Sequence, residues 1–371
     1  MGLVISTRFR FGEQDMISRR SLLAAAAAAP AVSLYAQPAK PKLKYLQIGI
    51  GHAHANKFSV YNESNDWDVV GIVEEDPELL AQAKEDPTYR DSKFLSLEEG
   101  LNTEGLSAVG IETHVRDLLS YAEKAIDAGY HIHLDKPAGD SFERYKALMK
   151  KADENDLVVQ MGYMYRFNPA VQLLHKMLDA GWLGEVFETH AVMSKVMPPS
   201  SRREIDEFAG GTMFELGCHI IDLTVGVLGR PDKVTLYARR VVEDPEDTLL
   251  DNMLAVFEYP KATATVRSTA VEVEGFSRRH FAVCGTKGTF HIQPLDRPSV
   301  RLSLSEERKF DGDDKVYKKG NSEILFQPPY KRYVGDAADL AAVIRGEKAN
   351  SYPSSHDLAV QEAVLKASGM M

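Results

Sequence analysis

Residues 45–61 read YLQIGIGHAHANKFSVY, and this stretch decides the fold of the first half of the chain. Its apolar start, residues 45–50, predicts a short strand, and residues 52–61 predict a helix. Gly49 and Gly51 predict a tight turn between the two. In such a turn the backbone can approach a pyrophosphate closely, and unpaired N–H groups at the start of the helix bind its charge. The stretch therefore predicts a dinucleotide-binding site.

The second predicted strand, residues 67–73, supports this interpretation. The motif itself is incomplete, because His54 stands where the G-x-G-x-x-G pattern has its third glycine. Glu74 follows the second strand, about where such folds carry an acid for the ribose hydroxyls. A carboxylate repels a 2′-phosphate, and none of the next few residues is basic, so we expect NAD rather than NADP. The alternative for Glu74 is a solvated acid that begins the next helix.

Strands and helices continue to alternate after this acid. The expected strands are 106–111, 129–134 and 157–161, and the expected helices are 116–128 and 142–154. This alternation predicts a doubly wound parallel sheet, a Rossmann-type α/β fold. Ligands bind at the carboxyl ends of such strands, which is where Asp135, Lys136 and Pro137 stand. A lysine there can also simply be solvated, so Lys136 gains meaning only if a second element brings a base to it.

The second half of the chain has a different pattern, in which strands follow one another without long helices between them. We expect strands at 187–193, 234–238, 252–259, 262–268, 280–284 and 289–292, and helices at 169–180, 214–228, 333–345 and 356–367. This pattern predicts an α+β domain with an open, mostly antiparallel sheet. The polar stretch 306–321 is expected to be an exposed connection.

A helix with a polar stripe is the most informative segment of this half. Glu215, His219 and Asp222 stand at i, i+4 and i+7, so on an α-helix they share one face. Burying such a stripe is costly unless its groups bond one another or a ligand. One interpretation is the wall of an active site, in which an acid fixes the tautomer of the imidazole. The alternatives are a surface stripe and a structural histidine that Asp222 satisfies.

The amino-terminal residues resemble a signal for export. Residues 18–36 contain Arg19 and Arg20, two leucines, six alanines and small residues near a cleavage point after Ala36. This resembles the twin-arginine signal, whose route carries folded proteins, and predicts export to the periplasm. The stretch is too short for a membrane span. The alternative is a disordered tail with an alanine-rich helix, and Met16 is a second candidate start of the chain.

The composition limits the classes of protein to which this chain can belong. The chain has 371 residues, of which 44% are hydrophobic and 26% are charged, as in soluble globular proteins with two domains. Its 44 Lys and Arg against 54 Asp and Glu give a net charge of −10, which argues against nucleic acid as a partner. The two cysteines, Cys218 and Cys284, form neither a disulfide scaffold nor a zinc cluster. We predict no metal site.

Four motifs in register resemble the glucose-fructose oxidoreductase and inositol dehydrogenase family. They are GIGHAH at 49–54, DKP at 135–137, QMGYMYRFNP at 160–169 and GGTMFELGCHIID at 210–222. The resemblance runs from about Lys44 to the carboxyl end and is specific for the family, not for a substrate. It implies domains at 43–162, for NAD binding, and at 163–371, for substrate binding and dimerisation. The signal occupies 1–36, and the terminal helices are expected to pack back on the first domain.

The resemblance also implies roles for single residues. Lys136 matches the lysine that binds the reacting hydroxyl, His219 matches the acid-base histidine, and Glu215 stands where relatives often have a substrate-binding aspartate. The expected substrate contacts are Tyr163, Arg166, Asn168 and Asp222. The expected cofactor contacts are Gly49, Gly51, His52, His54, Glu74, Thr113, Asp135 and Lys136.

Two departures from the family pattern concern the cofactor. Asp135 replaces the usual glutamate before Lys136, which shortens the carboxylate by one methylene. Relatives often have Thr-Pro-Asn after the third strand, whereas this chain has Thr113 followed by His114. His114 is either a substitute contact or a surface histidine. The affinity and exchange of the cofactor are the properties that these changes affect.

The resemblance implies an NAD(P)-dependent oxidoreductase that moves a hydride between a secondary hydroxyl of a sugar or cyclitol and nicotinamide. Because free NAD is scarce outside the cytoplasm, we expect a tightly held cofactor that is reduced and reoxidised in one site. One alternative is a redox-neutral, NAD-dependent glycoside-cleaving enzyme, and another is a noncatalytic NAD- or sugar-binding protein. Relatives often pair through the open sheet, which implies a homo-oligomer.

Overall fold

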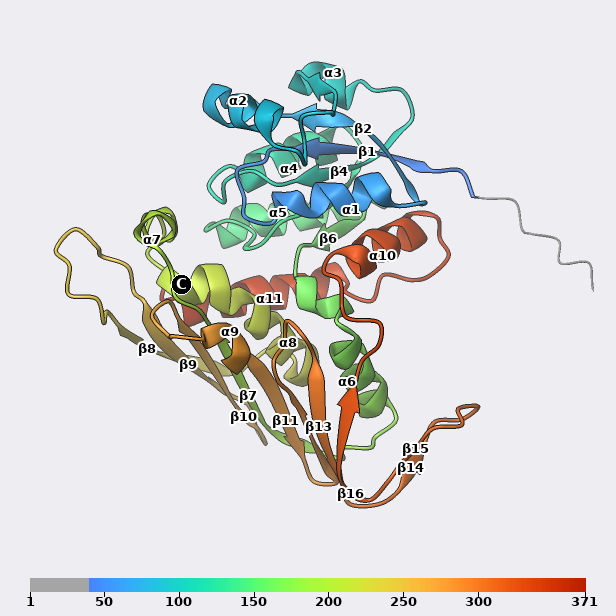
Figure 1. Ribbon diagram of the computed structural model, residues 1–371, viewed down its shortest axis with the longest axis vertical. Coiled ribbons are helices and arrows are strands. Elements are labelled where there is room, and N and C mark those ends of the chain that lie inside the picture. The colour runs from blue at the N-terminus through green and yellow to red at the C-terminus, as the bar shows by residue number, and fades with distance from the viewer. Residues whose placement is uncertain (1–39) are drawn as a thin grey trace, which may run out of the picture. The chain divides into compact units, whose positions relative to one another are not determined.

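Parallel strands form the first sheet, which lies at the top of Figure 1. Their order is β3-β2-β1-β4-β5-β6, the doubly wound order that the alternation predicts. Ile48 pairs with Val73 and with Ile111, so the carboxyl ends of three strands are level at one edge. The strands are β1 Leu43–Ile48, β2 Trp67–Val73, β3 Phe94–Leu95, β4 Leu106–Ile111, β5 His131–Leu134 and β6 Val159–Met161.

The computed structural model describes residues 40–371, so the predicted export signal lies outside the described residues. Among these residues no helix combines the length and the apolar character that a membrane span needs. The helices of the first half are η1 Ala55–Lys57, α1 Phe58–Glu63, α2 Pro77–Glu85, α3 Leu97–Leu101, α4 Leu118–Asp127 and α5 Phe142–Glu154.

The predicted helix at 52–61 is wrong in its start. His52 and His54 lie in the turn before the 3₁₀ segment η1, and the α-helix begins only at Phe58. Both imidazoles reach Asp135 at the end of β5, and this side-chain bonding holds the turn outside the helix. The helix α2 is a further element that we did not predict, although the Asp76 carboxylate caps it by accepting from the N–H groups of Glu78 and Leu79.

The second sheet is mixed, with the order β16-β13-β12-β11-β7-β10-β9-β8. Only the β7–β10 pair is parallel among its described neighbours, which confirms a mostly antiparallel sheet. The strands are β7 Val186–Ser194, β8 Lys233–Arg239, β9 Asn252–Glu258, β10 Thr263–Thr269, β11 His280–Gly285, β12 Gly288–Ile292, β13 Ser299–Leu304 and β16 Gly320–Leu325.

Three predictions for this half need correction. We did not predict β13 or β16, and the polar stretch 306–321 is not only a connection. It contains a small ribbon of β14 Arg308–Lys309 and β15 Val316–Tyr317 and the first residues of β16. In β13, polar residues alternate with buried apolar ones, because one face of the large sheet packs on the core and the other does not.

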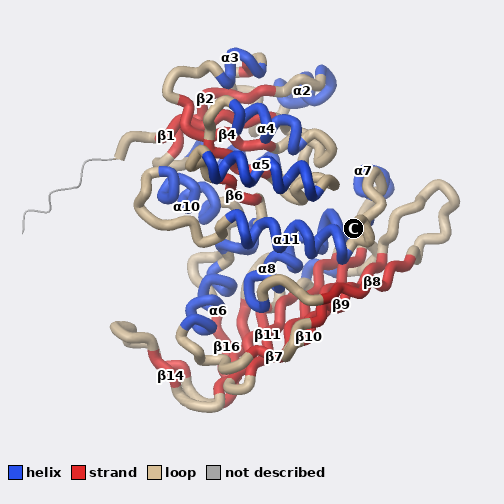
Figure 2. The backbone as a smooth tube through the Cα atoms, turned by 180° about the vertical axis from the view of Figure 1, so that it is seen from behind, coloured by secondary structure: helices blue, strands red, loops and turns tan. Residues whose placement is uncertain are grey.

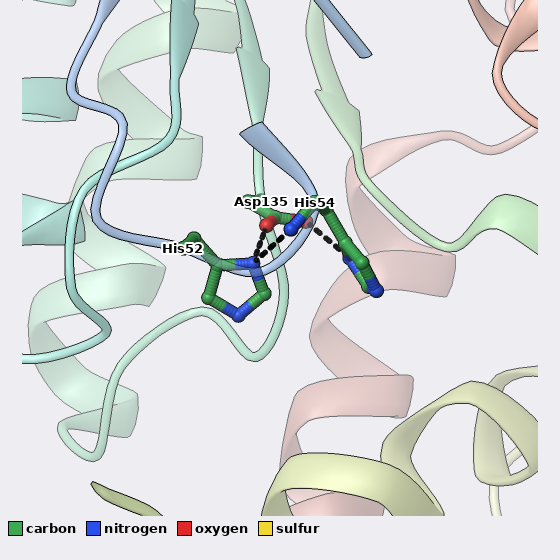
Figure 3. A group of neighbouring side chains, drawn as sticks. All are labelled: His52, His54 and Asp135. Atoms are coloured by element: carbon green, nitrogen blue, oxygen red, sulfur yellow. Dashed lines mark hydrogen bonds and ion pairs between the residues drawn. The ribbon is translucent and has the colours of Figure 1, made fainter. Parts of the chain in front are cut away.

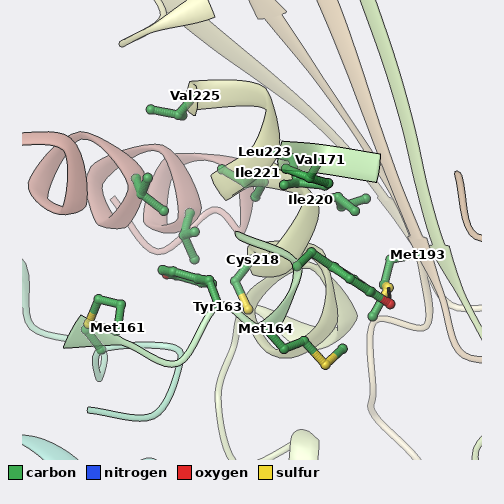
Figure 4. Packing of buried hydrophobic residues seen from close by; sticks show 14 of the residues in the cluster. Met161, Tyr163, Met164, Val171, Met193, Cys218, Ile220, Ile221, Leu223 and Val225 are labelled. Carbon is green, nitrogen blue, oxygen red and sulfur yellow. Dashed lines mark hydrogen bonds between the residues drawn. The ribbon is translucent and has the colours of Figure 1, made fainter. Parts of the chain in front are cut away.

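The helices of the second half are η2 Met164–Phe167, α6 Pro169–Asp179, α7 Pro199–Ile205, η3 Met213–Gly217, α8 Cys218–Leu228, α9 Gly275–Arg278, α10 Val334–Ile344 and α11 Ser354–Ala367. Among these helices, α8 and α11 pack against the large sheet (Figure 1). Figure 4 shows apolar side chains of α8, among them Cys218 and Ile221, in the same buried cluster as Tyr163 and Met164, and α8 contacts η2, which follows β6. This packing fixes the helix that carries His219 against the end of the first sheet.

The last two helices pack against the first half: α11 lies beside α5, as Figure 2 shows, and α10 packs against α1. The indole N–H of Trp67 donates to the carbonyl oxygen of Ala337 at 2.9 Å, and Leu340 joins the same apolar cluster. In α11, the Gln361 amide donates to the carbonyl oxygen of Gly139 at 2.7 Å. The carboxyl end of the chain therefore holds the two sheets in a defined relation around the site.

Candidate active site

A cavity of about 260 Å³ lies where the edge of the first sheet meets the helices of the second half. The turn after β1 and the segment after β5 contribute His52, His54 and Lys136 to its wall. The second half contributes Lys195, Glu215, His219, Arg279 and Arg332. The structure thus brings Lys136 and His219 to one cavity, although the sequence separates them widely.

Lys136 forms an ion pair with Glu215 across the two halves of the chain. Its Nζ lies 2.6 Å from Oε1 of Glu215 and 3.0 Å from the carbonyl oxygen of the same residue. Burial disfavours both charges, but each charge stabilises the other. The pKa of Lys136 therefore rises above its ordinary value, and that of Glu215 falls to about 2. Both groups are charged at neutral pH.

Glu215 belongs to a π-helical segment, not to a regular α-helix. This segment, Met213–Gly217, precedes α8 and is the kind of irregularity that is frequent at functional sites. Glu215 contacts Lys136 and His52, whereas Asp222 contacts Arg166. The predicted single polar stripe is therefore split between two environments.

Asp135 is the centre of a buried cluster at the end of β5, shown in Figure 3. Its carboxylate contacts Nδ1 of His52, lies 3.3 Å from Nδ1 of His54 and lies 3.4 Å from Nζ of Lys57. Burial disfavours a charged His52, but Asp135 outweighs burial and raises the pKa of His52 to about 9. Burial dominates at His54 and lowers its pKa to about 3. The cluster thus holds one protonated and one neutral imidazole.

His219 lies among aromatic rings and has no carboxylate partner. Its ring centroid is 5.4 Å from that of His54 and 5.7 Å from that of Tyr165. Its Nδ1 is buried without a hydrogen-bond partner, so the expectation that an acid one turn away fixes its tautomer is wrong. Burial, reinforced by Lys136, holds the pKa of His219 well below its ordinary value. The ring is therefore held in its neutral form, and its Nδ1 is unbonded within residues 40–371.

Arg166 and Asp222 lie behind the cavity, outside the residues that line it. Arg166 pairs with Asp222 at 2.6 Å and with Asp357 at 2.5 Å, and its guanidinium stacks on Tyr163 and Tyr352. All three charged groups are buried. This cluster ties η2 to α8 and α11, and the substrate contacts that we predicted for Arg166, Asp222 and Tyr163 stay predictions.

Asn168 has a local structural role at the start of α6. Its side-chain oxygen accepts from the N–H of Ala170 at 2.9 Å, which caps the helix, and its amide donates to the carbonyl oxygen of Leu295 at 2.8 Å. The residue is buried and absent from the cavity wall. Its predicted contact with substrate also stays a prediction.

The turn after β1 fits a dinucleotide. Gly49 has φ of +87°, and a Cβ at this position would lie 2.6 Å from the Thr113 side chain. Gly51 faces the ring of His114, which is half-buried in the cavity wall and is not a free surface histidine. Glu74 accepts from the N–H of Ile50 at 2.9 Å, so its carboxylate lies beside the glycine turn. The positive φ of Gly49 and the close approach of Thr113 require glycine at this position of the turn, as in the glycine-rich turns of dinucleotide-binding folds.

Two groups of side chains have the donor types of a metal site. They are His52, His54 and Asp135, and Asp222, His356 and Asp357. In each group a buried cation already balances the carboxylates, Lys57 in the first and Arg166 in the second. A metal ion would have to compete with these charges, so we interpret both groups as ion-paired clusters.

Sequence reasoning missed several cavity residues and one buried pair. Lys57 lies 2.8 Å from Glu112 beneath the site, and nothing in the spacing indicated this pair. Lys195 directly follows β7, and Lys136 stands two residues after β5, so the position near a strand end was a signal that could have been used. By contrast, Arg202 is buried and paired with Asp247 and Asp251.

Two domain profiles of one protein family match this chain. Residues 43–163 match "Oxidoreductase family, NAD-binding Rossmann fold", and residues 171–291 match "GFO/IDH/MocA C-terminal domain". The matched ranges contain Lys136, Glu215 and His219.

Curated relatives extend this similarity. An uncharacterized oxidoreductase, YhhX of Escherichia coli, is 27% identical over 69% of this chain and 73% of its own length. A scyllo-inositol 2-dehydrogenase (NAD+) of Bacillus subtilis is 26% identical over 57% of this chain and 63% of its own length. A D-xylose 1-dehydrogenase (NADP+) of Haloferax volcanii is 26% identical over 62% of this chain and 70% of its own length. Relatives with either cofactor are thus represented.

Solved structures share the fold over nearly the whole chain. A UDP-N-acetylglucosamine 3-dehydrogenase from Acidithiobacillus ferrooxidans superposes with a TM-score of 0.71 at 21% identity. The match covers 90% of this chain and 98% of that one. A putative oxidoreductase from Thermotoga maritima gives the same TM-score at 18% identity, covering 88% of this chain and 96% of that one.

Proposed function

We propose that this chain oxidises a secondary hydroxyl of a sugar or cyclitol. The chain belongs to the GFO/IDH/MocA family of oxidoreductases with an NAD-binding Rossmann domain. The names of the inositol and xylose dehydrogenase relatives support this substrate class. The observation that carries the proposal is the joint presence of Lys136 and His219 in one cavity, each supplied by a different half of the chain.

The two residues divide the work on the hydroxyl group. Lys136 is charged and held by Glu215, so it donates a hydrogen bond to the hydroxyl oxygen and stabilises negative charge there. His219 is neutral and takes the hydroxyl proton as general base. A bound nicotinamide supplies the hydride acceptor. Losing the base typically costs about 10²- to 10⁴-fold in rate, and losing one oriented donor costs about 10²- to 10³-fold.

Substitution of both residues tests this assignment. His219→Ala and Lys136→Ala should lose turnover of polyols and sugars, measured by NADH absorbance, but still quench or enhance NADH fluorescence on binding. His190→Ala is the matched control, because His190 lies on β7, bonded to Thr265, outside the cavity wall. Turnover at the wild-type rate in either cavity variant would refute the proposal.

The redox-neutral alternative has a separate signature. Aryl glycosides are incubated anaerobically with the protein as purified. Release of the aryl group without net NADH would assign the glycoside-cleaving cycle, whereas NADH formed in step with substrate supports net oxidation. Bound nucleotide with no absorbance change for any polyol or glycoside would assign a noncatalytic binding protein.

The proposal includes a tightly held cofactor, NAD in preference to NADP, and export to the periplasm by the twin-arginine route. Glu74 beside the glycine turn supports NAD, because its carboxylate would repel a 2′-phosphate. Mass spectrometry of nucleotide retained by protein from the exported fraction tests all three points. Pairing of two copies through the large sheet is part of the proposal, and light scattering measures it.

A further inference from the structure

We propose that the substrate is an anionic sugar or polyol, whose negative group binds Lys195, Arg279 and Arg332 at the second-domain end of the cavity. This inference rests on the proposed function for the reaction and names the substrate class of the same site. The shared chemistry is that of a carboxylate or a phosphate on the sugar. All three cationic side chains belong to the cavity wall.

Lys195 is a half-buried amine without a partner among the described residues. It directly follows β7, and its Nζ makes no hydrogen bond or ion pair within residues 40–371. Burial lowers its pKa, and the nearby charges of Arg279 and Lys136 lower it further. An ammonium kept in such a place loses hydration without compensation, so the free site is poised for an anion.

Two arginines beside Lys195 share a single carboxylate. Arg279 Nη1 lies 3.2 Å from Asp296, and Arg332 contacts the same carboxylate. Arg279 also donates from Nε to the carbonyl oxygen of Ser194 at 3.0 Å, which anchors it next to Lys195. Three cations against Asp296 leave a net charge of about +2 at this end of the cavity, in a chain whose net charge is −10.

Other acids of the cavity do not cancel this charge. Glu215 is committed to Lys136 and His52, and Glu207 is paired with Arg116 at 2.9 Å. Glu204 lies in the wall but is exposed to water, which screens it. The excess positive charge therefore remains available to a ligand.

The cofactor's pyrophosphate does not account for these cations. Its expected place is the glycine turn after β1, and neither Gly49 nor Gly51 belongs to the cavity wall. Lys195, Arg279 and Arg332 come from the second half, from β7, the residue after α9 and the segment before α10. Planar guanidinium groups beside an ammonium suit a carboxylate or a phosphate, which accept several charged donors at once.

A substrate panel tests the inference through specificity. The purified protein with its cofactor is assayed with D-glucose, D-glucuronate, D-gluconate and glucose 6-phosphate. We expect kcat/KM for one class of anionic substrate to exceed kcat/KM for the neutral sugar. Lys195→Met should lower kcat/KM for that anionic class about 10- to 100-fold by raising KM. Comparison of the two carboxylates, D-glucuronate and D-gluconate, with glucose 6-phosphate shows whether the site prefers a carboxylate or a phosphate. Lys318→Met is the matched control, because Lys318 is an exposed lysine outside the cavity.

A binding measurement keeps this inference separate from the proposed reaction. Titration calorimetry follows glucuronate and glucose 6-phosphate on wild type, Lys195→Met, Lys195→Arg and Arg332→Met. Anion binding that weakens in both methionine variants, recovers in Lys195→Arg and falls with salt supports the subsite even without turnover. Equal turnover of neutral and anionic sugars, with no effect of Lys195→Met on either, would overturn the subsite while leaving the proposed oxidation intact.

Discussion

Lys136 and Glu215 are joined by an ion pair of 2.6 Å that spans the two halves of the chain. Lys136 stands two residues after the end of β5, and Glu215 stands in the π-helical segment before α8. The side chain of Lys136 is buried, so without Glu215 its charge would have no adequate compensation there. The pair therefore orients the amine and keeps it protonated.

Glu215→Gln should lower activity and shift its pH dependence. The amide can still accept a hydrogen bond, but burial then acts on Lys136 without an opposing charge, so the pKa of Lys136 falls. We expect the alkaline decrease of kcat/KM to begin at a lower pH than in wild type. At pH 8 we expect the activity to be about 10- to 100-fold lower than that of wild type. A pH–rate profile measures both. An unchanged alkaline limb would contradict this role of Glu215.

The stability that His52 contributes should decrease as pH rises. Its pKa in the folded protein is about 9, above the ordinary value of 6.5, because Asp135 outweighs the effect of burial. The contribution is thus fully present below pH 6.5 and is lost as pH rises through about 9. Urea unfolding of wild type and His52→Gln at pH 6, 7.5 and 9.5 should give a difference in unfolding free energy that shrinks with pH. A difference that grows would refute the ion pair with Asp135.

Arg166→Met should destabilise the fold by about 3–5 kcal/mol, because it leaves Asp222 and Asp357 buried without their cation. Replacing the carboxylates as well, with Asp222→Leu and Asp357→Leu, should recover part of this loss. Urea unfolding measures the single and the triple variant. A change in KM at unchanged stability would instead place Arg166 in contact with substrate.

Glu74→Ser should weaken the preference for NAD. The carboxylate of Glu74 accepts from the N–H of Ile50, which fixes it beside the glycine turn. Without its charge, the repulsion of a 2′-phosphate is lost, and we expect the ratio of affinities for NADH and NADPH to fall about tenfold. Fluorescence titration with both nucleotides measures this. Glu75→Ser is the control, because Glu75 bonds the hydroxyl of Tyr121 instead.

Prolonged dialysis against EDTA should leave activity unchanged. The cluster of His52, His54 and Asp135 resembles a metal site in its donors, but Lys57 lies 3.4 Å from the same carboxylate and supplies the positive charge. Activity assays before and after dialysis, with elemental analysis of the protein, check this. Loss of activity that zinc or manganese restores would show that the cluster holds a metal.

Much of the fold could be predicted because its signals are local. Apolar runs with flanking turn residues located β2 and β4 at their observed bounds, and amphipathic spacing located α5. The strand β13 was missed although its apolar residues alternate with polar ones, and β16 was missed because residues 321–323 are all polar and leave only its end apolar. The start of the helix after β1 was wrong, because Asp135, far away in sequence, draws His52 and His54 out of helical geometry.

The sequence by itself determined the glycine turn, the strand-end lysine and the helix that carries an acid and an imidazole, since each depends on neighbours within a few residues. Which charges meet follows from the tertiary fold: Lys136 pairs with Glu215, Arg166 pairs with Asp222 and Asp357, and Lys195 pairs with no group within residues 40–371. The physical reason is that burial and pairing of charges depend on distances across elements, which no local pattern encodes. The same buried cavity that neutralises His219 leaves a positive end for a ligand.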